Sequence, residues 1–220
     1  MISKMNNNAL SLLLFICSLQ QISAQQHKFI GGVLLNFNGI EFKGNAVQYW
    51  TSSTQTTRID GTLGLSAGLF VKREFSKKAY SALELRYIRK GSIYEFISQY
   101  GTQAFQTVSL KYVEIPLLFG YKFKPYKRTF YLESGIAFAK LISSKIEEND
   151  LTPRIGTPNT KEFKKTDFSW IASLKFPLIK KWKQNFLFGL RVSRSITSIH
   201  EYYKIYNFDY GIELNYIFNK

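Results

Sequence analysis

The stretch NFDYGIELNY, residues 207–216, decides the fold. Every second residue in it is apolar or aromatic, and the residues between are polar, charged or glycine. Successive side chains of a β-strand point to opposite faces, so this pattern predicts a strand with one apolar and one polar face. The same alternation recurs in residues 32–38, 63–72, 83–87, 114–123, 130–138, 168–176 and 186–193. The sequence therefore predicts eight strands, an even number.

The connections between these strands alternate in length. Three are short and rich in lysine, at residues 76–79, 124–128 and 179–184, whereas four are longer, at residues 40–61, 97–106, 141–166 and 198–206. Short periplasmic turns that alternate with longer extracellular loops are typical of up-and-down transmembrane barrels. We therefore predict an all-β fold, an eight-stranded antiparallel up-and-down transmembrane β-barrel with short periplasmic turns and long extracellular loops.

The start of the chain resembles a targeting segment. Lys4 precedes a short apolar stretch at residues 9–19, and small residues follow before Gln25. A basic start, a short apolar core and a small-residue exit are the three parts of a secretory signal. We predict a cleavable signal peptide at residues 1–24 and an outer-membrane β-barrel domain at residues 25–220. The only cysteine, Cys17, falls inside the signal, so no disulfide is expected in the barrel.

The polar face of the strands carries both signs of charge. Lipid offers no hydrogen-bond partners, so a membrane barrel turns its apolar face outward and closes its sheet. The interior of an eight-stranded barrel is about filled by side chains, and buried charges persist only when they are paired. We predict a polar network in the lumen and expect no catalytic, cofactor-binding or metal-binding residues. Its four acids and three bases are Glu84, Arg86, Glu114, Glu133, Lys175, Arg191 and Glu213.

The chain is strongly basic, with 30 Lys and Arg against 15 Asp and Glu and a formal charge of +15. No basic helix or glycine-rich phosphate loop accompanies this charge, so we expect no nucleic-acid partner. The cations concentrate in turns and near strand ends, where long side chains reach lipid headgroups. We therefore expect outer-membrane lipid, including anionic lipopolysaccharide, as a partner. Aromatic residues at strand ends are expected in interface girdles: Trp50, Tyr80, Tyr94, Tyr112, Tyr126, Trp170, Trp182 and Tyr202.

Three other interpretations use the same pattern. A soluble lipocalin-like barrel would place the apolar face around a ligand and the polar face in water. A porin-like barrel would let a small solute pass. A barrel hydrolase would need a histidine beside a carboxylate, and only His200, next to Glu201 in the last loop, offers one. We interpret His200 as a solvated surface residue and expect no catalysis.

Two central strands carry a family resemblance. Residues 112–118, YVEIPLL, follow residues 83–91, LELRYIRKG. This pair resembles the Y-x-E-I-P-L-L and L-E-L-x-Y-x-x-K-G strands of the PorT-like outer-membrane β-barrel family. The resemblance implies an eight-stranded barrel in the outer membrane and no enzymatic activity. As a separate expectation, the protein is associated with protein secretion or envelope assembly and has an envelope or secretion-machinery protein as a partner.

Overall fold

The computed structural model describes residues 29–44, 55–98, 103–125, 128–148, 160–177 and 185–218. The predicted signal peptide, residues 1–24, lies outside them. The described residues form strands and one short 3-10 helix, which in chain order are β1 Phe29–Gly44, β2 Gln55–Asp60, β3 Thr62–Glu74, β4 Ala79–Ser98, β5 Gln103–Phe123, β6 Phe130–Glu148, η3 Thr160–Glu162, β7 Thr166–Pro177, β8 Phe186–Ser195 and β9 Ile205–Ile217.

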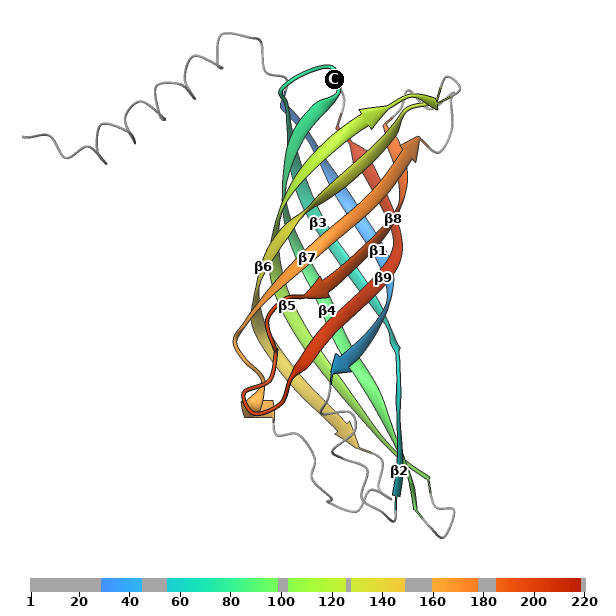
Figure 1. Ribbon diagram of the computed structural model, residues 1–220, viewed down its shortest axis with the longest axis vertical. Coiled ribbons are helices and arrows are strands. Elements are labelled where there is room, and N and C mark those ends of the chain that lie inside the picture. Colours follow the sequence, from blue (N-terminus) through green and yellow to red (C-terminus); the bar gives the residue numbers. More distant parts are fainter. Residues whose placement is uncertain are drawn as a thin grey trace, which may run out of the picture.

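Eight of the strands form a closed ring (Figure 1). The neighbours are β4-β3-β1-β9-β8-β7-β6-β5, and pairing of β5 with β4 completes the circle. All pairings are antiparallel, and β1 pairs with β9, which joins the two ends of the sheet. Strand β2 lies outside the ring and pairs only with residues 93–98 of β4. The predicted eight-stranded antiparallel barrel is confirmed.

The ring has two unlike rims. The short-turn rim carries the β3–β4, β5–β6 and β7–β8 connections, together with the start of β1 and the end of β9. The long-loop rim carries the four longer connections. The predicted loop boundaries were wrong at this rim, because residues 40–44, 55–60, 97–98, 103–106 and 141–148 are strand.

Part of the wall continues beyond the ring at the long-loop rim. Strands β4, β5 and β6 have 20, 21 and 19 residues, whereas β7, β8 and β9 have 12, 10 and 13. The outer ends of β4, β5 and β6 and the short β2 therefore form a protruding sheet, toward the lower end of Figure 1. We call these residues, 55–60, 93–98, 103–108 and 143–148, the protruding sheet.

Side chains alternate between the two faces of the wall as the sequence predicted. Outward-facing residues are large and apolar, including Leu69, Leu85 and Ile136, each exposed by more than half. Many inward-facing residues of the same strands, such as Lys72, Glu84 and Glu133, are charged and almost completely buried. This orientation is the reverse of a lipocalin, whose interior is apolar, so the lipocalin-like interpretation was wrong. Within the described residues, no helix is long and apolar enough to cross a membrane.

Candidate functional site

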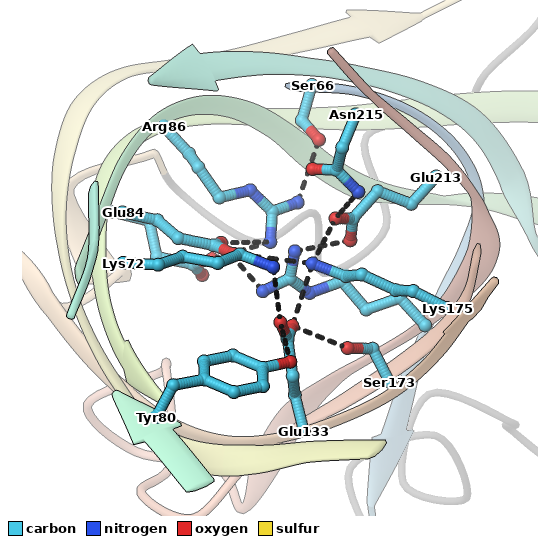
Figure 2. Close-up of polar contacts among 12 residues, drawn as sticks. Ser66, Lys72, Tyr80, Glu84, Arg86, Glu133, Ser173, Lys175, Glu213 and Asn215 are labelled. Atoms are coloured by element: carbon cyan, nitrogen blue, oxygen red, sulfur yellow. Dashed lines mark hydrogen bonds and ion pairs between the residues drawn. The ribbon is translucent and has the colours of Figure 1, made fainter. Parts of the chain in front are cut away.

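All seven charged residues singled out in the sequence lie inside the barrel. None is more than 3% exposed: Glu84, Arg86, Glu114, Glu133, Lys175, Arg191 and Glu213. They come from β4, β5, β6, β7, β8 and β9, so nearly every part of the wall contributes. Figure 2 labels five of them and shows their side chains extending from the wall toward the barrel axis: Glu84, Arg86, Glu133, Lys175 and Glu213.

Glu133 of β6 forms one centre of the network. One carboxylate oxygen, Oε1, accepts from Lys72 Nζ at 3.0 Å and from the Tyr80 hydroxyl at 2.8 Å. The other, Oε2, accepts from Ser173 Oγ at 3.0 Å and lies 2.7 Å from Lys175 Nζ. The carboxylate thus joins β3, β4, β6 and β7 with two cations and two hydroxyls, which is the full pairing that a buried charge requires.

Arg191 and Lys175 form a second centre with two more acids. The Arg191 guanidinium donates to Glu213 at 2.5 Å and to Glu84 at 2.7 Å. Lys175 Nζ lies 2.7 Å from Glu213, and Asn215 Nδ2 donates to the same Glu213 oxygen at 2.7 Å. Three strands of the ring separate β8, which carries Arg191, from β4, which carries Glu84, in either direction. These contacts therefore connect opposite sides of the barrel.

Arg86 and Lys90 extend the network toward the long-loop rim. Arg86 and Glu114 are direct partners across the β4–β5 pairing, and their charged groups lie 3.5 Å apart. Lys90 Nζ lies 3.1 Å from both Glu114 and Asp167. Asp167 also accepts from Ser195 and Asn207 at 3.0 Å each. A continuous set of polar contacts therefore runs along the inside of the barrel.

Four buried charges of this interior were absent from the sequence prediction: Lys72, Lys90, Asp167 and Asp209. Lys90, Asp167 and Asp209 lie an even number of positions from a predicted residue on the same strand, and Lys72 lies on the polar face of the predicted strand 63–72. The alternation itself could therefore have identified all four. Lys90 and Asp167 were missed because the predicted strands ended or began too close to the membrane centre. The described interior holds six acids and five bases, so the basic excess of the whole chain lies elsewhere.

An apolar cluster closes the lumen between the charged network and the long-loop rim. It combines strand residues such as Phe42, Tyr94 and Leu110 with Phe163 and Ile199 from the loops. All of its core members are no more than 4% exposed. The polarity of the interior therefore changes along the axis, from charged in the middle of the barrel to apolar at this end.

His200 holds the two loops of this closure together, and its prediction as a solvated residue was wrong. The residue is only 1% exposed and forms an isolated β-bridge with Phe163. Its Nδ1 accepts from the backbone N–H groups of Tyr202 and Tyr203, and Nε2 lies 3.3 Å from a carboxylate oxygen of Glu162. Burial lowers the pKa of the imidazole, while the Glu162 carboxylate opposes that shift.

The aromatic girdle prediction was partly wrong. Tyr80, Tyr94 and Tyr112 are each no more than 1% exposed and point into the lumen. Trp170 and Tyr202 are exposed, by 44% and 74%. The other three predicted aromatics, Trp50, Tyr126 and Trp182, lie outside the described residues.

The chemistry of the interior is that of a structural network. The charged groups whose contacts are given above are engaged by opposite charge or by hydroxyl and amide donors, and side chains from different strands meet near the axis (Figure 2). Among the residues that the structure describes, no group of three or more His, Cys, Asp or Glu is arranged to hold a metal ion. The arrangement can tie the strands together and fill the lumen.

Comparison with known proteins agrees with this architecture. The model of the family described as outer membrane protein beta-barrel domain matches residues 21–201. The chain belongs to this family. As a member of the outer membrane β-barrel domain family, the protein lies in the cell outer membrane. No curated protein sequence matches the chain.

Solved structures with a similar fold share little sequence with this family member. Ail, the attachment invasion locus protein of Yersinia pestis, is 13% identical, with 87% of this chain and 99% of that chain covered and a TM-score of 0.46. OprG from Pseudomonas aeruginosa is 12% identical, with 87% and 95% covered and a TM-score of 0.40. Neisserial surface protein A is 8% identical, with 86% and 97% covered and a TM-score of 0.45.

Proposed function

We propose that the protein is a non-catalytic outer-membrane barrel that binds another envelope protein through its protruding sheet. The observation that carries the proposal is the unpaired edge of this sheet. Strand β5 pairs with β6 as far as Glu148, whereas β7 pairs with β6 only as far as Lys140. Among the described strands, none pairs with the other side of residues 143–148. Unpaired N–H and C=O groups on such an edge can accept an added strand from an extended segment of a partner.

The filled interior supports a binding role over a transport role. The ion-paired network and the apolar cluster occupy successive levels of the lumen, and eight strands enclose about the volume of the side chains themselves. A porin-like function would need an aqueous path that these residues occupy. This disfavours the alternative of a narrow diffusion barrel.

The two strand motifs support a finer proposal, that the protein is of the PorT-like type and takes part in protein secretion or envelope assembly. In the structure the motif strands β4 and β5 are direct neighbours. Four of their charged residues, Glu84, Arg86, Lys90 and Glu114, point inward and are ion-paired, whereas Arg89 lies on the outer side. The motifs therefore describe how this kind of barrel fills its lumen, and the partner is sought among envelope or secretion-machinery proteins.

Photo-crosslinking in intact cells tests the binding proposal. A crosslinking amino acid replaces Lys145, whose exposed side chain lies on the unpaired part of β6. The matched control replaces Lys140, which is also exposed but lies where β6 is paired on both sides. We expect a discrete adduct with one envelope protein from position 145 and none from position 140. Adducts from both positions, or from neither, would contradict the proposal.

A further inference from the structure

A groove on the outer surface of the wall combines a cation with aromatic rings. It measures about 340 Å³ and is lined by Trp170, Arg194, Ser195, Ile196 and Tyr206. Trp170 of β7 and Arg194 of β8 are direct partners in the strand pairing. The indole N–H of Trp170 donates to Ser134 Oγ at 3.1 Å, which fixes the ring against the wall.

The groove lies where the apolar outer surface ends. The outward side chains of β8, counted from the short-turn rim, are Phe186, Phe188, Leu190 and Val192, and Arg194 is the first charged one. On β9 the outward residues nearest the long-loop rim are all aromatic, at Tyr206, Phe208 and Tyr210. Aromatic belts mark the level of the lipid headgroups in membrane barrels. The groove is therefore at headgroup level, on the side of the long loops.

Arg194 presents its charge on the outer face of the wall. Its side chain is exposed, and among the described residues no acid forms an ion pair with it. A guanidinium binds phosphate through two parallel hydrogen bonds, and it does so more strongly at the edge of an apolar phase than in open water. Indole and phenol rings beside it offer apolar faces and polar tips, which suit the boundary between sugar and acyl chain.

We infer that this groove binds the phosphorylated sugar headgroup of lipopolysaccharide. The inference rests on the predicted barrel topology, in which the long loops face outside and this rim meets the outer leaflet. Arg194 then holds a phosphate, and Trp170 and Tyr206 flank the sugar.

Native mass spectrometry of the purified barrel, titrated with diphosphoryl lipid A, tests the site. We expect Arg194→Gln to weaken lipid A binding by about tenfold or more, the loss expected for one charge-assisted contact. The matched control is Arg73→Gln, because Arg73 lies near the short-turn rim and stacks on Phe29 and Phe75. This control removes the same charge and is expected to leave lipid A binding unchanged. Retention of the compact heat-modifiable form on a gel establishes that both variants are folded.

Titration with phosphatidylglycerol distinguishes the two sources of lipid phosphate. We expect Arg194→Gln to change phosphatidylglycerol binding little. An equal loss for both lipids would overturn the assignment to lipopolysaccharide. An equal loss from Arg194→Gln and Arg73→Gln would show general charge attraction and overturn the site itself. Neither result would alter the crosslinking outcome at Lys145. The lipopolysaccharide site and the binding of an envelope protein by the protruding sheet are therefore tested independently.

Discussion

Removing the Glu133 carboxylate should destabilise the barrel more than any change on its lipid face. Glu133→Ala leaves Lys72 and Lys175 without their shared partner, since these nitrogens lie 3.0 and 2.7 Å from its oxygens. It also removes the acceptor of the Tyr80 and Ser173 hydroxyls. Breaking a buried ion pair by removing one partner costs about 3–5 kcal/mol, and here two cations are affected at once.

The loss of stability can be read as a change in unfolding temperature. At about 2–4 °C per kcal/mol for a chain of this size, Glu133→Ala should lower the unfolding temperature by roughly 6–20 °C. The assay follows the compact and heat-modified bands on a gel after stepwise heating in one detergent. Glu133→Gln keeps an acceptor oxygen for one of the two hydroxyls but lacks the charge, so we expect it to fall between wild type and Glu133→Ala.

The neighbouring residue provides the matched control. Leu132 lies on the same strand, faces outward and is 51% exposed. Leu132→Ala removes apolar contacts that lipid or detergent chains can replace, because those chains are as apolar as leucine. Its unfolding temperature should stay close to that of wild type. If Glu133→Ala and Leu132→Ala unfolded at the same temperature, the reasoning about an ion-paired lumen would be refuted.

Three further predictions follow from the same structure. Glu114→Ala, which removes the partner of Arg86 and Lys90, should lower the unfolding temperature clearly, whereas the lipid-facing Leu117→Ala should cost less; equal effects would contradict this. The lowered pKa of His200 means that its stabilisation of the loop closure is complete above the ordinary value of about 6.5 and is lost as the pH falls through the lowered pKa. Hydrogen exchange in the two loops, corrected for its intrinsic pH dependence, should therefore increase under mild acid, and His200→Gln should abolish that increase. A tag inserted at Gly156 should be reached by antibody on intact cells and one at Lys77 should not, with the reverse labelling contradicting the assigned orientation.

The alternation of side chains predicted the ring of eight strands, but the predicted strands ended too early at the long-loop rim. In the membrane-spanning part of β4, Leu83 and Leu85 face outward and Glu84 faces inward. Farther along the same strand the inner face is mixed, because Ile88 and Tyr94 face inward together with Lys90, and Arg89 lies on the outer side. A strand that leaves lipid for water no longer has one apolar and one polar face, so a search for one fixed pattern ends there.

For the candidate site, the sequence predicted the direction in which each side chain faces, but it did not predict the partners of that side chain. The alternation of side chains along each strand was enough to select Glu84, Glu133 and Arg191 as inward-facing residues. Their partners could not be predicted, because the register between strands and the reach across the lumen depend on closure of the whole ring. His200 illustrates the limit, since its partner Glu162 comes from another loop 38 residues earlier and no periodic pattern connects them.

The central claim is that the charged network and the apolar cluster close the lumen. Planar-bilayer recording of the purified monomer tests it most directly. The account predicts no steady conductance, or a very small one, because paired side chains fill an eight-stranded interior. Large, steady channels from the monomer would contradict it and would support a porin-like barrel.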